Sequence, residues 1–502
     1  MKIPFVLRLL LAFGAGAALV LAFAPFDGGW LAPAALALLF LLWWRTDARR
    51  AFGLGWAFGL GHMGFGVFWL HHSIAQFGGF DPISAKAVTL AFAAFLAGFP
   101  ALVGGLVNRW LPPGRARLWL GYPAAWVLAE WLRTWLFTGF PWLLVGYSQT
   151  DTPLAGWAPL AGVLGVSLAV ALAASALAGL VAGGWAGLRR PAPWALLVVL
   201  YLGGWGLSWP TWSRPAGAPL TVALVQPNIP QAIKWRPEQR LPTLERLLRL
   251  SEGAPEAELV IWPETAVPAF AEVLQADFLD PVDRRWRQAG RRLLLGIPVS
   301  ETSARYYNAA IVLGASPPSH YYKRHLVPFG EYLPFKAWLG PVMDWLAVPM
   351  SDFSAGTQAR PLMTVGPHAV GLSICYEDAF GREVAQALPD AHYLVNLSND
   401  AWFGDSLAPH QHLQMARMRA LETARWLLRG TNTGISALID PKGRVVGRQR
   451  LFTTGVLQGR IEPLAGATPY VKWGDGPVLG LILLMLMAAW RSGRRPGSGS
   501  RP

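Results

Sequence analysis

Long apolar segments dominate the first 210 residues of the chain. Windows of about 20 apolar residues, the length that crosses a hydrocarbon core, recur there. They predict membrane spans at residues 5–24, 30–44, 52–71, 87–107, 118–137, 157–183 and 193–210, with an eighth at 474–490. The second window is short and contains Pro33, so its limits are the least defined. No small-residue cleavage site follows the first window, which predicts a retained span and not a removed signal peptide.

Residues 215–470 follow a different pattern, with more charge, more proline and shorter apolar runs. The runs predict buried strands at 220–225, 257–262, 292–297, 307–313, 369–374 and 392–397. Amphipathic helices are predicted at 237–251 and 409–428, and a D-P-K-G turn at 440–443 joins two late strands. Strands that alternate with helices predict an α/β domain with a mostly buried sheet.

These patterns divide the chain into four parts. Residues 1–212 carry the first seven transmembrane helices, 213–470 form the α/β domain, and 471–492 carry the eighth helix. The tail R-S-G-R-R-P-G-S-G-S-R-P is of low complexity, which predicts disorder over 493–502.

Basic residues fall on one side of the predicted spans. The fourteen residues concerned are Lys2, Arg8, Arg45, Arg49, Arg50, Arg109, Arg115, Arg117, Arg189, Arg190, Arg491, Arg494, Arg495 and Arg501. The opposite short loops, around 25–29, 72–85 and 138–156, contain no Lys or Arg. Because short loops rich in Lys and Arg stay cytoplasmic, both termini are predicted in the cytoplasm and residues 213–470 outside it.

The composition agrees with a membrane protein. Of the 502 residues, 53% are hydrophobic and only 14% are charged, and 26 are tryptophan. The net charge of +14 does not indicate nucleic-acid binding, because much of the basic excess lies in the loops that set the topology and not on one folded face.

A single cysteine, Cys375, lies in the string V-G-L-S-I-C-Y-E-D, where an apolar run stops abruptly. One cysteine excludes an intramolecular disulfide. A thiol at a strand end is expected to be exposed for attack, as at other nucleophiles placed on a turn. The alternative is that Cys375 is a small buried hydrophobic residue, as many free cysteines are.

Two other residues could supply the chemistry that a thiol lacks. Glu264 ends the string L-V-I-W-P-E-T, where it could accept and return the thiol proton. Lys323, in Y-Y-K-R-H-L-V-P-F-G-E-Y-L-P-F, could supply a cation for the thiolate and for an oxyanion. Taken singly, Glu264 could instead be a carboxylate at a helix start and Lys323 a solvated strand residue.

The strings W-P-E-T, Y-Y-K-R-H-L-V-P-F-G-E-Y and S-I-C-Y-E-D, in that order, resemble the carbon–nitrogen hydrolase (nitrilase) superfamily. The membrane frame around them, with Q-P-N-I-P-Q-A-I-K-W at 226–235 and S-N-D-A-W-F at 398–403, resembles the apolipoprotein N-acyltransferase family. The resemblance covers nearly the whole chain except the tail. The ordered set is specific, whereas each motif alone is weak.

The resemblance implies a role for each matching residue. Glu264 would be the general base, Lys323 the oxyanion stabiliser and Cys375 the nucleophile. Glu331 and Glu377 match two further acidic positions, which would hold Lys323 and orient Glu264. The substrate-binding candidates are the aromatic positions Trp235, Tyr376, Trp402 and Phe403.

The resemblance also implies a fold and a reaction. The fold is a four-layer α-β-β-α sandwich at 213–470, opening toward the membrane. The implied enzyme is a monomeric, multi-pass protein of the bacterial inner membrane with its catalytic domain on the periplasmic side. It would move an acyl chain from a phospholipid, through a cysteine thioester, to the N-terminal amine of a diacylglyceryl-cysteine apolipoprotein. No metal or organic cofactor is implied. The alternatives are a membrane-tethered amidase or nitrilase, with water as acceptor, and an inactive module that binds lipoproteins.

Three further features have open interpretations. The apolar segment 336–350 contains Trp338, Trp345 and Met343, which predicts a lid that enters the outer leaflet unless it is a buried loop. Glu130 and Arg133 lie three residues apart in the fifth span, so they share a helix face and could neutralise each other or line an entry for a lipid headgroup. His62, His71 and His72 show no metal-ligand spacing.

Overall fold

The computed structural model describes residues 4–302, 305–334, 336 and 352–492. Within these ranges the chain forms two compact units, and each is described by itself. The first contains residues 4–71, 81–210 and 473–492. The second contains 72–80 and 211–472. The proposed lid segment, apart from Lys336, and the tail lie outside the described residues.

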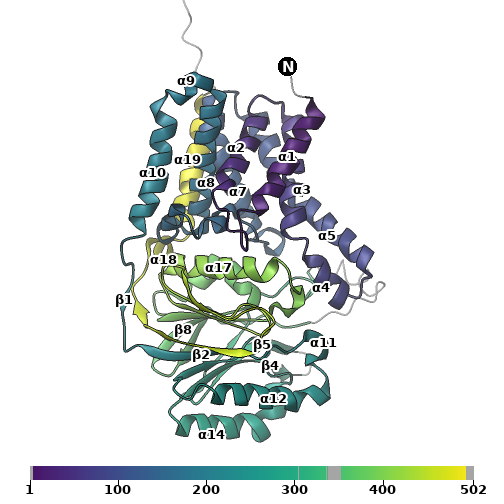
Figure 1. Ribbon diagram of the computed structural model, residues 1–502, viewed down its shortest axis with the longest axis vertical. Helices are drawn as coiled ribbons and strands as arrows, with labels where there is room; N and C mark the ends of the chain where they lie inside the picture. The colour runs from purple at the N-terminus through teal and green to yellow at the C-terminus, as the bar shows by residue number, and fades with distance from the viewer. Residues whose placement is uncertain (1–3, 303–304, 335, 337–351, 493–502) are drawn as a thin grey trace, which may run out of the picture. The chain divides into compact units, whose positions relative to one another are not determined.

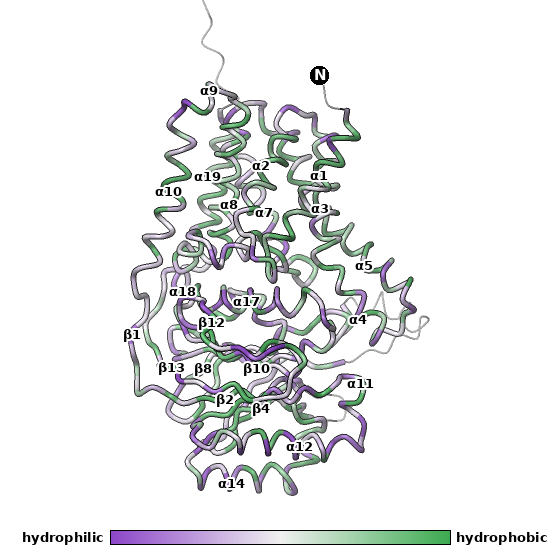
Figure 2. Tube along the Cα trace, viewed as in Figure 1, coloured by the Kyte–Doolittle hydropathy of each residue, from purple (hydrophilic) through white to green (hydrophobic). Residues whose placement is uncertain are grey.

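The first unit is built from apolar helices (Figures 1 and 2). Its α-helices are α1 Phe5–Val20, α2 Leu31–Trp44, α3 Ala48–Gly66, α4 Leu70–Phe77, α5 Pro82–Leu96, α6 Gly98–Trp110, α7 Tyr122–Arg133, α8 Ala158–Ala182, α9 Gly184–Leu188, α10 Pro191–Leu207 and α19 Gly476–Ser492. Shorter turns are η1 Arg117–Gly121, η2 Leu136–Thr138, η3 Val145–Gln149 and η4 Pro153–Trp157. Residues 72–77 of α4 belong to the second unit.

Two described helical segments, Pro82–Trp110 and Pro153–Ala182, are long and apolar enough to cross a membrane. A third is obtained if α3 and α4, which meet at 58°, form one broken span. Helices α1, α2, α10 and α19 are apolar but shorter, at 10–17 residues. A membrane-associated helical unit is therefore supported, whereas the predicted number of eight spans is not confirmed.

Glycines allow the backbones of α1 and α3 to approach each other closely. A Cβ built on Gly16 would lie 1.9 Å from the carbonyl oxygen of Phe58, and one on Gly61 would lie 2.1 Å from that of Phe13. Any side chain there would force the two helices apart. Small residues at such crossings are typical of helix packing in membranes.

Glu130 and Arg133 bind separate partners instead of each other. Glu130 Oε1 accepts hydrogen bonds from Trp126 Nε1 (3.0 Å) and the Val145 amide (2.9 Å). Arg133 donates to the Trp142 carbonyl at 2.6 Å. Each group binds the irregular segment 142–145 that follows α7, and both interpretations, mutual neutralisation and the lining of a headgroup entry, stay predictions.

The second unit contains two six-stranded sheets (Figure 1). The first, here the N-sheet, has the order β13-β2-β3-β4-β5-β6, and the second, the C-sheet, has the order β12-β11-β10-β9-β8-β7. The strands are β1 Arg214–Pro215, β2 Leu220–Gln226, β3 Leu259–Ile261, β4 Arg292–Thr302, β5 Arg305–Leu313, β6 His320–Tyr322, β7 Leu362–Val365, β8 His368–Ile374, β9 Tyr393–Ser398, β10 Leu427–Thr431, β11 Ala437–Ile439, β12 Val445–Arg448, β13 Gly455–Ile461 and β14 Leu464–Ala465. Strands β1 and β14 form a separate antiparallel pair.

Alternation along the strands explains the layers. In β2, Val222 and Leu224 enter the core between the sheets, whereas Ala223 and Val225 face a second core. That second core includes Leu247 of α12 (Pro237–Glu252) and Trp286 of α14 (Asp280–Gln288). Neighbouring strand residues point to opposite faces, so the N-sheet is covered by the other sheet on one face and by helices on the other.

The C-sheet is covered in the same way. Its outer face packs against Val384 of α16 (Gly381–Ala385) and Leu413 of α17 (Ala408–Thr423). The expected α-β-β-α sandwich is therefore confirmed, with two mixed sheets in place of the one sheet expected from the strand pattern alone. Remaining short helices are α11 Gln231–Lys234, α13 Ala271–Leu274, η5 Gln275–Leu279, η6 Cys375–Ala379, η7 Asp400–Phe403 and α18 Pro469–Trp473.

Candidate active site

Three strand ends bring Glu264, Lys323 and Cys375 together. Glu264 follows β3 and Lys323 follows β6, both in the N-sheet, while Cys375 directly follows β8 in the C-sheet. Lys323 Nζ lies 3.4 Å from Glu264 Oε1. Both charged groups also act electrostatically on the Cys375 thiol, since Glu264 raises its pKa and Lys323 lowers it.

Lys323 lies between two carboxylates. Its Nζ donates to Glu331 Oε1 at 2.9 Å as well as to Glu264 Oε1. Asn308 Nδ2 joins the same two oxygens at 3.0 Å and 2.7 Å. Burial alone would lower the pKa of Lys323, but Glu331, Glu264 and Cys375 raise it above its ordinary value. The ammonium therefore stays charged, and its third proton remains available as a donor.

Glu264 has one fixed oxygen and one open oxygen. Oε1 is held by Lys323 and Asn308, whereas buried Oε2 has no hydrogen-bond partner among the described residues. Strand β4 also limits the loop, since a Cβ on Gly296 would lie 2.8 Å from the Glu264 Cα. A buried acceptor without a partner is costly, and Oε2 is the Glu264 oxygen that is left to accept a further hydrogen bond.

Cys375 is buried, contrary to the exposure expected from its strand-end position. Only 8% of the residue is accessible, and it belongs to the core between the sheets. Its φ of 52° is unusual for a non-glycine residue and marks a sharp turn after the strand. Burial, and next Glu264, raise the pKa of the thiol, while Lys323 lowers it, with a net increase. The resting group is therefore a protonated thiol, which becomes a strong nucleophile only when a base removes its proton.

Glu377 holds the segments on either side of the site. One oxygen accepts from the Tyr321 hydroxyl (2.9 Å) and the amides of Arg324 (2.7 Å) and His325 (3.1 Å). The other accepts from the Ile374 amide at 2.7 Å. Burial raises its pKa, although these amides favour the charged form. Glu377 thus ties the chain around Lys323 to the chain around Cys375 through the backbone, while Glu331 contacts the lysine itself.

A buried polar cluster under Cys375 was missed by the sequence analysis. Its members, here the imidazole cluster, are Asp378, Asn396, Asp400, His412 and Arg429. His412 Nε2 lies 3.2 Å from the Cys375 carbonyl and 2.8 Å from Asp378, and Nδ1 lies 2.9 Å from Asp400. Arg429 binds both aspartates, at 3.2 and 2.9 Å. Asn396 Nδ2 donates to the Cys375 carbonyl at 3.3 Å. The cluster thus fixes the backbone of the turn that carries the thiol.

The charge on His412 makes the cluster sensitive to pH. Burial and then Arg429 lower the pKa of His412, but Asp378 and Asp400 outweigh them and raise it to about 9. Because this folded-state pKa lies above the ordinary 6.5, the charged imidazole of His412 contributes to the stability of the fold. This contribution is fully present below a pH of about 6.5 and is lost as the pH rises through about 9.

We therefore expect wild type to lose more thermal stability than His412→Gln between pH 6.5 and 9.5. Thermal unfolding of both proteins in detergent measures the difference. The comparison with His412→Gln is needed because burial lowers the pKa of Lys234 to about 8. Loss of the Lys234 proton makes the fold more stable as the pH rises above about 8, which opposes the effect of His412. If the unfolding temperature changed equally with pH in the two proteins, a charged His412 would be excluded.

Lys234 is a second buried group that the sequence analysis missed, although it belongs to the I-K-W string. It is 1% exposed and donates to Thr265 Oγ1 (2.7 Å) and to the Glu264 carbonyl (3.4 Å). Thr265 has a φ of 43°, a strained conformation for a β-branched residue. These bonds hold the backbone of Glu264 and its neighbour in place.

Lys234→Met should lower kcat about 10- to 100-fold with little change in KM, because Glu264 loses its position and not its carboxylate. Steady-state kinetics of the variant test this, with Lys472→Met as a control at an exposed lysine of the same unit. Lys234→Arg should recover part of the loss. A normal kcat in Lys234→Met would show that Lys234 does not position Glu264.

The four aromatic candidates differ in exposure. Trp235 is 48% exposed, and Lys234 Nζ lies 5.9 Å from its ring centre. The Trp402 ring packs edge-on against Phe77, with centres 4.5 Å apart. Tyr376 is buried against Phe380, and Phe403 is half-buried. In the described ranges no group of three or more His, Cys, Asp or Glu side chains is arranged to hold a metal ion.

Comparison with known proteins finds relatives along both units. Residues 15–176 match the family model described as the apolipoprotein N-acyltransferase N-terminal domain, and residues 221–470 match that of carbon-nitrogen hydrolases. A protein of Methylococcus capsulatus named apolipoprotein N-acyltransferase is 46% identical, covering 98% of this chain and 97% of its own. One of the same name from Nitrosomonas europaea is 44% identical, covering 97% and 98%. Among solved structures, an amidase from Nesterenkonia sp. is 17% identical, with a TM-score of 0.32, and covers 52% of this chain and 94% of that one.

Proposed function

Because this chain belongs to the apolipoprotein N-acyltransferase family, we propose that it transfers a fatty acyl chain from a membrane phospholipid to the N-terminal amine of a diacylglyceryl-cysteine apolipoprotein. The reaction runs in two half-reactions through a thioester on Cys375. Covalent storage of the acyl group lets two bulky lipid substrates use one site in turn.

In the first half-reaction Glu264 Oε2 accepts the Cys375 proton as the sulfur attacks the ester carbonyl. The C–S bond forms, and the carbonyl oxygen becomes an oxyanion stabilised by the third Nζ proton of Lys323 and by a backbone amide. The ester C–O bond then breaks. Glu264 returns the proton to the departing oxygen, so that a lysophospholipid leaves and the acyl-enzyme remains.

In the second half-reaction the neutral N-terminal amine of the apolipoprotein attacks the thioester carbonyl. Lys323 again faces the oxyanion, and Glu264 removes the proton that the attacking nitrogen must lose. The C–S bond breaks and the proton returns to sulfur, which regenerates the thiol. The product is an N-acylated, triacylated lipoprotein.

The observation that carries this proposal is the unequal use of the two Glu264 oxygens. Lys323 and Asn308 hold Oε1, while Oε2 is buried and has no partner among the described residues. A module that only binds lipoproteins gains nothing from this arrangement, since a buried lysine with two carboxylates is costly to maintain. A general base beside a protonated thiol explains it.

The distribution of products separates acyl transfer from hydrolysis. Purified enzyme is incubated with phospholipid carrying a labelled acyl chain, with and without a synthetic diacylglyceryl-cysteine peptide. We expect the label in the peptide amide and little free fatty acid. Label released mainly as free fatty acid in the presence of the peptide would favour a membrane-tethered amidase or esterase instead.

We also propose that the first unit spans the bacterial inner membrane eight times. The short helices support this, because they expose large apolar side chains such as Leu10 of α1 (62%), Leu202 of α10 (61%) and Leu484 of α19 (60%). Such surfaces are unfavourable in water and suit lipid. The one-sided basic residues support cytoplasmic termini and a periplasmic catalytic domain. Reporter fusions after Trp212 should report the periplasm, and those after Arg495 the cytoplasm. The reverse result would exclude this orientation.

A further inference from the structure

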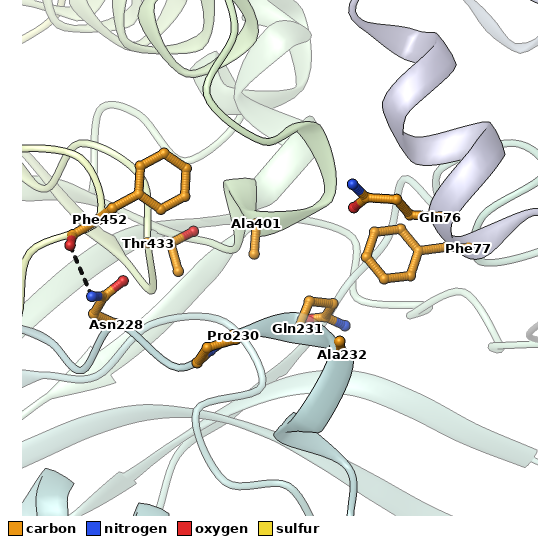
Figure 3. Close-up of a pocket in the computed structure, with 9 residues that line it drawn as sticks. All are labelled: Gln76, Phe77, Asn228, Pro230, Gln231, Ala232, Ala401, Thr433 and Phe452. Atoms are coloured by element: carbon orange, nitrogen blue, oxygen red, sulfur yellow. Dashed lines mark hydrogen bonds between the residues drawn. The ribbon is translucent and has the colours of Figure 1, made fainter. Parts of the chain in front are cut away.

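A pocket in the second unit lies outside the Glu264–Lys323–Cys375 set. It has a volume of about 420 Å³ and is lined by residues far apart in the sequence. In Figure 3, Gln76 and Phe77 lie on one side, Asn228, Thr433 and Phe452 on the other, and Gln231 below them. The volume is within the range of roughly 300–1,000 Å³ that is usual for pockets that bind small ligands or short segments.

Two buried side chains, Asp400 and His412, lie between the lining of this pocket and the backbone of Cys375. Ala401, which lines the pocket, follows Asp400, and Asp400 Oδ1 lies 2.9 Å from His412 Nδ1. The other nitrogen of that ring lies 3.2 Å from the carbonyl oxygen of Cys375. The pocket therefore lies near the turn that carries Cys375, on the far side of these two buried side chains.

The chemistry of the lining excludes two kinds of occupant. The described lining residues carry no ionisable side chain, so none of them could form an ion pair with a phosphate headgroup. A purely hydrocarbon chain would also fit poorly, because Thr433 is only 4% exposed and its hydroxyl has no hydrogen-bond partner among the described residues. A buried hydroxyl without a partner is unfavourable until a polar ligand satisfies it.

The side-chain amides of Asn228 and Gln231 provide further atoms that could bond to a ligand. Asn228 Nδ2 donates to the Phe452 carbonyl at 2.9 Å (Figure 3), which leaves its oxygen without a hydrogen bond to the described chain. Gln231 Oε1 accepts a hydrogen bond from Asn399 Nδ2 at 2.8 Å. The amide protons of Gln231 likewise make no hydrogen bond to the described chain. The pocket thus offers acceptors, donors and apolar surface without charge. A peptide backbone, with alternating N–H and C=O groups, has the matching chemistry.

We propose that this pocket binds the peptide segment that follows the lipidated cysteine of the acceptor, with Thr433 Oγ1 bonded to its backbone. The inference rests on the proposed acyl transfer and names the part of the acceptor that the enzyme recognises besides its lipid. An uncharged extension of small residues fits the pocket best.

The test compares two acceptors, diacylglyceryl-cysteine amide and the same cysteine with an uncharged peptide extension. In Thr433→Val the ratio of kcat/KM for the long acceptor to that for the short one should fall about tenfold, the usual cost of losing one buried hydrogen bond. Thr433→Ser should retain the ratio. Thr364→Val, at an exposed threonine of β7, is the matched control.

A second variant keeps the test valid if Thr433→Val does not fold. Gln76→Met alters an exposed side chain of the lining and should also lower the ratio. If both variants keep the wild-type ratio, or lose activity equally on both acceptors, the pocket does not bind the peptide. If wild type acylates neither acceptor, the proposed function itself fails, which is a distinct result.

Discussion

Replacement of Cys375 by alanine should abolish the acyl-enzyme and all lipid transfer. The sulfur is the only group at the site that can form the thioester, so no other side chain can replace it. Because Cys375 belongs to the core between the sheets, the change should also cost about 1–2 kcal/mol of stability. Mass spectrometry of the peptide that contains residue 375, after incubation with phospholipid, measures the first effect, and thermal unfolding measures the second.

Cys375→Ser provides the matched variant, with a nearly equal side-chain volume and a much weaker nucleophile. It should fold as well as wild type and form no detectable acyl-enzyme on the assay timescale. Acyl chains still attached to the same peptide in Cys375→Ala would remove this residue from the mechanism.

Replacement of Glu264 by glutamine should lower the rate of acyl-enzyme formation by about 10²–10⁴, the usual contribution of a general base. Glutamine keeps the volume and one oxygen, so Lys323 and Asn308 can still bind position 264. The thiol would then have no base to remove its proton, since burial keeps its pKa high. Single-turnover measurements with labelled phospholipid test this half-reaction alone.

The pH dependence distinguishes a lost base from a lost position. In Glu264→Gln, raising the pH should partly restore the rate, because more of the thiol ionises without help. Lys234→Met, which keeps the carboxylate, should show no such recovery. A Glu264→Gln enzyme with a wild-type rate at neutral pH would contradict the role of Glu264.

The strand ends of the site could be predicted from the sequence, because each follows a local change of pattern. Apolar runs stop before Glu264 and Cys375, but these residues follow strands of different sheets, β3 of the N-sheet and β8 of the C-sheet. Pairing of two separate sheets is not local information. The pattern at 369–374 therefore could not show that Cys375 would be covered by the opposite sheet and be nearly inaccessible.

The region 409–428 shows why the imidazole cluster was missed. Its polar residues predict an amphipathic helix with a solvated face, but α17 ends at Thr423 and buries His412, Arg419 and Glu422. Ala424 has a left-handed conformation, and Leu427 begins strand β10 against β9. A polar residue is predicted to be exposed unless a partner for it is known. The partners of His412 include Asp378, which lies far away in the sequence. The two His and three Arg residues at 409–428, with only one carboxylate among them, were the available signal.

The most direct test of the account is the isolation of its covalent intermediate. Enzyme incubated with phospholipid alone should carry one acyl chain, bound to Cys375 as a thioester that neutral hydroxylamine removes. Addition of a diacylglyceryl-cysteine peptide should discharge it, and the acyl chain should appear as an amide on the peptide. An acyl chain bound to any other residue, or a Cys375 thioester that the peptide cannot discharge, would contradict the proposed mechanism.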